Sequence, residues 1–295
     1  MSSALRRPST LGRSMWRKVS LPNGITCNQA SITTPPTTTP DHVQTKLPPV
    51  AGHENTQRFR EFNLEGRIVA VTGGGRGLGL AMAEALMEAG ANVWCLDRLE
   101  IPDPEFETAK ERSKGAYGGS MNYTRIDVRD QAHVNSVMAE IAGEKKRLDG
   151  IICAAAINHV HSAIGHSQEA LEEVMKINYN GVFNSTTAAA KQMFHRKNNG
   201  SILLVATPLG RCLAMEWGRH GIRVNSLCPG HILTPMVEQV FEQTTAARAT
   251  WEAENMLGRL AQAEEFRGAA LFAMSDASAF MTGSNLVIDG GHTAW

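Results

Sequence analysis

The fold is decided by twelve residues, Ile68-Val69-Ala70-Val71-Thr72-Gly73-Gly74-Gly75-Arg76-Gly77-Leu78-Gly79. The first four are apolar and mostly β-branched, a pattern typical of a strand that is buried on both faces. The glycines after Thr72 give the backbone the freedom for a tight turn. Residues 78–89 then carry apolar side chains at helical spacing, and Gly90 is the expected stop of that helix. The stretch therefore predicts a strand, a turn and a helix in direct succession.

This succession favours the binding of a dinucleotide. Gly77 and Gly79 lack side chains where a pyrophosphate must approach and where the helix must pack closely on the strand. The first N–H groups of the helix and the positive end of its dipole would face the phosphates. A second strand, over 92–96, ends in Asp97, about 20 residues beyond the turn, where a carboxylate accepts hydrogen bonds from the adenosine ribose. An ordinary cap at the end of a strand is the alternative role for Asp97.

The choice between NAD and NADP rests on charge. The Asp97 carboxylate would repel a phosphate at the ribose 2′ position, which favours NAD. Arg76 and Arg98 lie close enough in sequence to neutralise such a phosphate, which keeps NADP open. On the sign of the nearest charge, NAD is the expected cofactor.

Composition excludes some classes of function. The chain has 295 residues, 42% of them hydrophobic, and a formal net charge of zero. This is enough for one α/β domain of about 230 residues and a tail, and it gives no reason to expect nucleic acid or membrane binding. The five cysteines form no CxxC pair, and Cys95, Cys153 and Cys228 fall in apolar segments. We therefore expect buried free thiols in a reducing compartment and no metal site.

Residues 1–62 differ from the rest. Up to Pro40 they contain many basic residues, serines, threonines and prolines but no acid, and this composition does not support a core. They lack the apolar block of a secretory signal and any run of membrane-spanning length. Leu11, Met15 and Val19 recur at helical spacing between arginines, as in a mitochondrial transit peptide. A disordered cytosolic extension or a misassigned start is the preferred interpretation, with mitochondrial targeting as the alternative, and residues 63–295 are expected to form the single folded domain.

Strands and helices alternate from Leu64 onward. The alternation implies a parallel sheet with right-handed crossovers and helices on both faces, a Rossmann-type doubly wound α/β fold. Ser167 is the expected N-cap of the longest helix. Further strands are expected over about 122–126, 150–155, 201–206, 222–227 and 285–288, and further helices over about 131–145 and 169–197.

Several motifs accompany the glycine turn and Asp97: Asp127-Val128, Cys153-Ala154-Ala155-Ala156, Asn178, Gly221-Ile222-Arg223-Val224-Asn225, Pro229-Gly230 and the ending from Gly283 to Gly291. Together they resemble the classical short-chain dehydrogenases/reductases, over Leu64 to Trp295. The resemblance implies an NAD(P)-dependent oxidoreductase that interconverts a carbonyl and a secondary alcohol. A sugar, a polyol or a secondary metabolite is the expected class of small-molecule substrate.

The resemblance also assigns cofactor contacts. The pyrophosphate would be lined by Gly73, Arg76, Gly77, Leu78 and Gly79, the adenosine ribose by Asp97, and the adenine by Asp127 and Val128. Ala154 and Ala155 match the loop that borders the cofactor, although Cys153 and Ala156 replace its usual Asn and Gly. Ile232 and Thr234 match positions that meet the nicotinamide and the phosphate. Residues 233–256, with Trp251, resemble the lid over the substrate.

Proton transfer in the family needs a tyrosine, a lysine four residues later, a serine and an asparagine. Asn178 fits the asparagine, and Thr207 stands where the serine is expected. The tyrosine and the lysine have no counterpart, because Tyr179 is the last tyrosine of the chain and Lys197 the last lysine. His220 and His231 carry imidazoles that can move protons near neutral pH, but we do not expect them to replace the pair.

The spacing of two strands indicates a deletion. About fourteen residues separate Thr207 from Ile222, near the minimum for a parallel crossover with a helix, and only residues 211–219 fit that helix. In the family the missing piece carries the tyrosine, the lysine and much of a helix that packs on another subunit. We expect that roughly two dozen residues are missing, that the chain is inactive as written, and that its assembly into homo-oligomers is impaired. The alternatives to an enzyme are a catalytically silent dinucleotide-binding protein and a product of splicing or of a gene-model error.

Overall fold

The computed structural model describes residues 59–113, 118–144, 146–243 and 247–294. The expected tail lies outside these ranges up to residue 58, so its disorder and its targeting role stay predictions. Its last residues form a short 3-10 helix, η1 (Arg60–Phe62). Among the described residues, no helix is both long and apolar enough to cross a membrane.

The core is a seven-stranded parallel sheet with the strand order β3-β2-β1-β4-β5-β6-β9. β1 is buried along its whole length, as its apolar sequence predicts. The direction in which strands are added reverses between β1 and β4, and ligands of such sheets bind beyond the carboxyl ends of the strands at this reversal. The strands are β1 (Ile68–Thr72), β2 (Asn92–Asp97), β3 (Ser120–Arg125), β4 (Gly150–Cys153), β5 (Gly200–Val205), β6 (Ile222–Pro229) and β9 (Asn285–Ile288).

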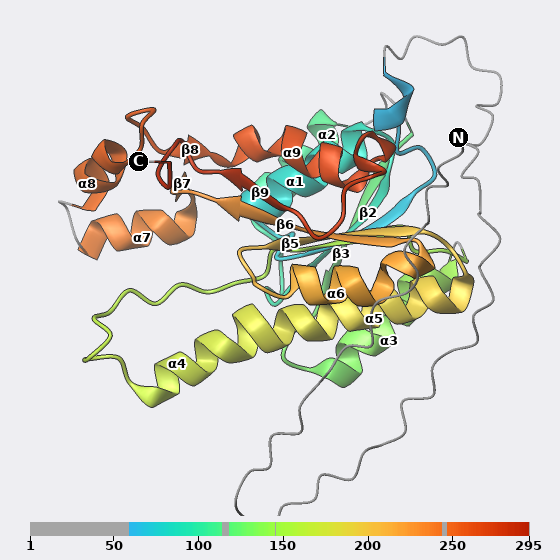
Figure 1. The fold of residues 1–295 in the computed structure, drawn as a ribbon, viewed down its shortest axis with the longest axis horizontal. Helices are drawn as coiled ribbons and strands as arrows, with labels where there is room; N and C mark the ends of the chain where they lie inside the picture. The colour runs from blue at the N-terminus through green and yellow to red at the C-terminus, as the bar shows by residue number, and fades with distance from the viewer. Residues whose placement is uncertain (1–58, 114–117, 145, 244–246, 295) are drawn as a thin grey trace, which may run out of the picture. The chain divides into compact units, whose positions relative to one another are not determined.

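Helices cover both faces of the sheet (Figure 1). One face carries α1 (Gly77–Glu88), α2 (Pro104–Arg112) and α9 (Arg267–Met274). The other carries α3 (Gln131–Glu144), α4 (Gln168–Met175), α5 (Val182–Arg196) and α6 (Gly210–Trp217). Each face buries its own apolar cluster, centred on Met82 and Phe266 in the first layer and on Met138 and Met193 in the second. The predicted doubly wound α/β fold is confirmed.

The expected long helix over 169–197 is not one regular helix. α4 and α5 are joined by a π-helical turn, η2 (Lys176–Gly181), which contains Asn178. Ser167 is the N-cap of α4, as expected, and its hydroxyl accepts a hydrogen bond from the Ala170 N–H at 3.1 Å. The sequence analysis did not predict α2, although Asp103, which precedes Pro104, is a recognisable helix N-cap.

The connection between β5 and β6 is short. Between them it holds the eight-residue α6 and the 3-10 turn η3 (Gly218–His220), so the connection is as short as the sequence predicts. Two further 3-10 helices, η4 (Ala263–Phe266) and η5 (Asp276–Ser278), flank α9. Of the cysteines, Cys95 and Cys153 are buried free thiols as expected, whereas Cys228 is partly exposed and Cys212 is exposed.

A smaller group of elements lies beyond the carboxyl end of β6 (Figure 1). β7 (Ile232–Leu233) pairs in parallel with β8 (Ala261–Gln262). The helices α7 (Pro235–Gln243) and α8 (Ala247–Glu254) lie between these two strands in the chain. The segment expected to form a lid is therefore largely helical where the structure describes it.

Candidate functional site

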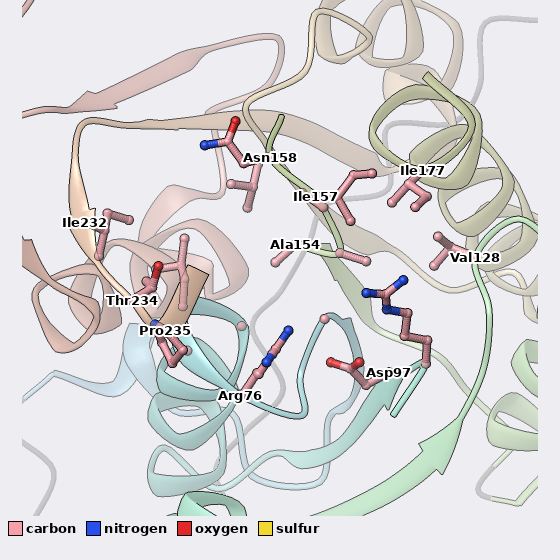
Figure 2. A pocket seen from close by; sticks show the side chains of 18 of the residues that line it. Arg76, Asp97, Val128, Ala154, Ile157, Asn158, Ile177, Ile232, Thr234 and Pro235 are labelled. Carbon is pink, nitrogen blue, oxygen red and sulfur yellow. The ribbon is translucent and has the colours of Figure 1, made fainter. Parts of the chain in front are cut away.

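A cavity of about 630 Å³ opens beyond the carboxyl ends of the central strands. Figure 2 shows Arg76 and Asp97 on one side of it, Val128 and Ile177 on another, and Thr234 facing them. Twelve of the residues expected to contact a cofactor line this one cavity: Gly73, Arg76, Gly77, Leu78, Gly79, Asp97, Asp127, Val128, Ala154, Ala155, Ile232 and Thr234. The fold thus brings together positions that the sequence spreads over about 160 residues.

The glycine turn is packed too closely for side chains. Gly73 has a φ of +70°, and a Cβ there would lie 2.8 Å from the Ala155 backbone nitrogen, so the loop after β4 touches the turn directly. A Cβ on Gly79 would lie 2.1 Å from the Gly73 carbonyl oxygen. α1 begins at Gly77, so its first free N–H groups face the cavity. The turn is therefore an anion-binding surface of backbone N–H groups at a helix start.

Asp97 is held at the end of β2 by two backbone groups. Its Oδ2 accepts a hydrogen bond from the Gly75 N–H at 3.1 Å, and its Oδ1 accepts one from the Leu99 N–H at 3.3 Å. The cap of a strand end and a ribose contact are therefore compatible roles, because a carboxylate accepts about four hydrogen bonds. The side chain is partly exposed and lines the cavity.

The end of the cavity at Asp127 carries an ion-pair network that the sequence did not reveal. Arg129 donates to Asp127 at 2.9 Å and to Glu173 on α4 at 2.5 Å. The hydrogen bond from Arg129 holds the pKa of the Asp127 carboxyl below its usual range. Three arginines, Arg76, Arg98 and Arg129, and two carboxylates, Asp97 and Asp127, line the cavity. This excess of positive charge suits an anionic ligand.

Asn178 and Thr207, the two expected catalytic residues, are not among the residues that line this cavity. The amide of Asn178 accepts from the Ile157 N–H and donates to the Ile157 carbonyl, both at 2.9 Å. It thereby fixes the loop after β4, and its neighbour Ile177 faces the cavity. Thr207 is 8% exposed, and its Oγ1 is buried with no hydrogen-bond partner.

Neither tyrosine described by the structure is placed for proton transfer in the cavity, and Tyr117 lies outside the described residues. Tyr123 donates its hydroxyl proton to the Leu99 carbonyl at 2.7 Å. Burial, together with the charge of Asp97, raises its pKa to about 12, which is the wrong direction for a general base. Tyr179 lines a second cavity of about 570 Å³. Lys176, residues of α5 and Leu209 line it too.

His231 is the histidine that lines the main cavity. It follows Gly230, and its ring stacks on Trp251 of α8 with centroids 4.4 Å apart. Its Nε2 lies 3.8 Å from the Glu254 carboxylate. Burial, and next the charge of His292, lowers the pKa of His231 despite that carboxylate.

Sequence reasoning missed part of the lining. Ile157 and Asn158 belong to the loop after β4, and Pro235 and Val237 to the start of α7. Figure 2 shows Asn158 and Pro235 on different sides of the opening. The signal for Arg129 was its position two residues after Asp127; the loop residues carry no local signal.

Known proteins share this fold and this sequence pattern. Residues 67–212 match the family described as short chain dehydrogenase, and residues 207–293 match the family described as enoyl-(acyl carrier protein) reductase. The 2,5-dichloro-2,5-cyclohexadiene-1,4-diol dehydrogenase of Sphingobium indicum is 32% identical, over 79% of this chain and 99% of its own. The ribulose-forming D-arabinitol 2-dehydrogenase of Candida albicans is 29% identical, over 79% of this chain and 95% of its own.

A solved structure agrees with these relatives. The gluconate 5-dehydrogenase from Burkholderia cenocepacia, in complex with NADP and tartrate, superimposes with a TM-score of 0.71 at 29% identity, covering 80% of this chain and 98% of that one. The chain therefore belongs to the short-chain dehydrogenase/reductase family of NAD(P)-dependent oxidoreductases.

Proposed function

We propose that this chain binds an NAD(P) dinucleotide in the main cavity and does not catalyse hydride transfer as written. The observation that carries the proposal is a glycine turn packed for a pyrophosphate, with Asp97 beside it, in a chain that has no tyrosine after Tyr179 and no lysine after Lys197. The dinucleotide supplies the hydride chemistry, and the protein must supply the proton. We therefore expect the protein to bind the cofactor without turnover.

The lengths of the alignments support a deletion. The comparison with the Sphingobium dehydrogenase spans 254 positions, whereas 79% of 295 residues is about 233, so about 21 positions have no residue of this chain. The comparison with the Candida dehydrogenase spans 267 positions and leaves about 34. These values bracket the roughly two dozen residues expected from the short crossover.

The crossover itself supports the same interpretation. Ala206 follows β5 with a φ of +53°, a left-handed conformation that costs a non-glycine residue about 1 kcal/mol or more. The four residues from Ala206 to Leu209 connect β5 to α6, which begins at Gly210. The second cavity lies against Leu209, Tyr179 and Phe183, where a longer helix between β5 and β6 would find room.

NAD is the proposed cofactor, although the Burkholderia relative holds NADP. Asp97 is anchored by the Gly75 and Leu99 N–H groups with its carboxylate at the cavity wall, where it would repel a 2′-phosphate. Arg129 would attract that phosphate less strongly than an unpaired guanidinium would, because it already pairs with Asp127 and Glu173. The negative charge of Asp97 at the ribose position therefore favours an unphosphorylated ribose, against the attraction of Arg76 and Arg98 for a phosphate.

The proposed ancestral reaction is carbonyl/secondary alcohol interconversion on a polyol, a sugar or a related hydroxylated metabolite. The relatives support this class, since one is named for a cyclic diol, one for D-arabinitol and one for gluconate. An enzyme with a substitute acid/base is the alternative, and the placement of Asn178 and Thr207 outside the cavity favours the catalytically silent dinucleotide-binding protein over it.

The test compares binding with turnover. Full-length protein is titrated with NADH and NADPH by nicotinamide fluorescence, then assayed in both directions with polyols, cyclic diols, sugar acids and ketones. We expect saturable NADH binding and no steady-state change in cofactor absorbance, while Gly79→Ala serves as the variant without binding. Turnover with stoichiometric product overturns the proposed inactivity, and absence of binding by the parent chain overturns the proposed cofactor site. Sequencing of transcripts across Gly210-Arg211 would detect the missing codons directly.

A further inference from the structure

Three potential metal ligands from distant parts of the chain meet beside the main cavity. His231 lies between β6 and β7, Glu254 is the last residue of α8, and His292 follows β9. One ligand atom from each lies within 4.8 Å of the other two. Two imidazoles and a carboxylate are a donor set that suits zinc and related divalent transition metals.

His231 is held in place from three sides. Its ring stacks on Trp251 at an interplanar angle of 10°, and it meets the His292 ring at 73° with centroids 5.1 Å apart. Its carbonyl accepts a hydrogen bond from the Ala261 N–H at 3.0 Å, which ties the residue to β8. A ligand with its ring packed and its backbone fixed loses little freedom when it binds an ion.

His292 is held by a turn built on Asp289. The Asp289 carboxylate accepts from the Gly291 N–H and from the Thr293 N–H, both at 2.9 Å, and from the Thr293 hydroxyl at 2.6 Å. These bonds lower the pKa of Asp289 and keep a negative charge next to the His292 ring. The Nδ1 of His292 is buried and has no hydrogen-bond partner among the described residues. A buried ring nitrogen without a partner is costly unless something else binds in the cluster.

The spacing of the three ligands is within reach of a metal. Bonds of about 2.0–2.2 Å from zinc to nitrogen and oxygen place tetrahedral ligands about 3.4 Å apart. The Nε2 of His231 already lies 3.8 Å from the Glu254 carboxylate, so that pair needs a shift of only a few tenths of an ångström. The Glu254 side chain is 48% exposed and stands at the end of α8.

We propose that His231, Glu254 and His292 form a binding site for one divalent transition-metal ion, of the zinc class, at the rim of the cofactor cavity. The ion joins the end of α8 to the segment after β9. Because His231 and Trp251 both line the main cavity, the ion also fixes the cavity wall that these two residues form. This site is independent of the proposed loss of turnover, since it uses no residue of the connection between β5 and β6.

The chain contains a useful competitor for the metal. His159, His161 and His166 lie in the exposed loop before α4, with ring centroids of His166 and the other two 5.8 and 6.2 Å apart. Replacing these three by alanine removes more imidazoles than the proposed site contains. The triple variant is therefore a matched control for adventitious binding by surface histidines.

The test measures metal binding directly. Full-length protein is treated with a chelator, dialysed against Zn²⁺ and quantified by elemental analysis, and Co²⁺ is added in parallel to read the ligand geometry from its visible absorption. We expect one equivalent of bound Zn²⁺ and an intense, near-tetrahedral Co²⁺ spectrum. Glu254→Gln, His231→Ala and His292→Ala are each expected to weaken binding by at least about tenfold, whereas the triple loop variant keeps the parent affinity.

Two results overturn the proposal: no stoichiometric binding by the parent chain, or binding that survives Glu254→Gln and His292→Ala but is lost in the loop variant. Glu254→Gln keeps the experiment decisive if a histidine variant fails to fold, because its exposed position tolerates an amide. A second measurement is independent of the ligand assay. Zn²⁺ should raise the melting temperature of the parent chain and leave that of Glu254→Gln unchanged, with circular dichroism in chelator showing equal folding of both.

Discussion

Replacing Asp97 by asparagine is expected to change the preference between NAD and NADP. Asparagine keeps one oxygen, which can accept from either the Gly75 or the Leu99 N–H, so one of the two hydrogen bonds at the strand end is kept and the other is lost. What it removes is a negative charge at the wall where the adenosine ribose is proposed to bind. The lost backbone hydrogen bond affects both cofactors, so the ratio of their two affinities isolates the charge.

The magnitude follows from Coulomb's law. Two unit charges about 4 Å apart interact by about 4 kcal/mol at an effective dielectric of about 20. Asp97 is partly exposed, so solvent screening reduces the repulsion of a 2′-phosphate to about 1.4–2 kcal/mol. Its removal should strengthen NADPH binding about ten- to thirtyfold, while NADH should weaken a few-fold because a charge-assisted hydrogen bond to its ribose becomes neutral.

Both affinities are measurable by nicotinamide fluorescence at two salt concentrations, without any turnover. Glu100→Gln is the matched control, because it removes the same charge three residues away and Glu100 does not line the cavity. The control should leave the ratio of the two affinities unchanged. An equally unchanged ratio in Asp97→Asn would refute the ribose assignment, and an advantage for NADPH that does not shrink with salt would refute the electrostatic reason.

Gly79→Ala should abolish dinucleotide binding and lower the free energy of unfolding by about 3 kcal/mol, because its Cβ would overlap the Gly73 carbonyl, whereas Gly143→Ala, with open space around it, should not destabilise. Glu84→Gln should cost about 3 kcal/mol at neutral pH, since it leaves Arg112 and Arg267 without their buried partner. Burial raises the pKa of Glu84, but the hydrogen bond from Arg112 and the charge of Arg267 outweigh it, so the net shift is downward. The parent chain should therefore lose this stability as pH falls below about 4.5, and denaturation of Glu84→Gln over a pH series should show a shallower loss. Light scattering should find no tight tetramer, because α6 is only eight residues long; a stable tetramer would contradict the proposed impairment.

Local signals explain why the cofactor side could be predicted. The turn at Gly73 and Gly79 is fixed by contacts within a few residues and by one neighbouring loop, so the pattern of glycines is sufficient. Asp97 is the last residue of β2 and Asp127 lies two residues after the end of β3, and parallel strands end at one edge of the sheet. Their position in the cavity is thus a consequence of the strand pattern alone.

The positions of Asn178 and Thr207 depend on features with no local signal. Asn178 sits in a π-helical turn that a uniform helical pattern does not reveal, and this turn directs its amide to Ile157. Thr207 follows the left-handed Ala206, which the sequence does not distinguish from an ordinary alanine. His231 and His292 meet because β6 pairs with β9, a tertiary contact between segments about 60 residues apart, and Glu254 joins them from the end of α8. Spacing along the chain therefore predicts no metal site.

Cofactor binding and proton transfer depend on different parts of the sheet. One can therefore be lost while the other is kept. The short connection between β5 and β6 allows six residue pairs between these strands, from Gly200 with Ile222 to Val205 with Leu227. With that register kept, β6 delivers Thr234 to the glycine turn, where its Cγ2 lies 4.0 Å from the Cβ position of Gly77. The features near this connection are the left-handed Ala206 and the second cavity, which shares only Arg129 with the main cavity. A chain without the tyrosine and lysine pair can therefore keep its cofactor cavity, which is the physical basis of the proposed binding without turnover.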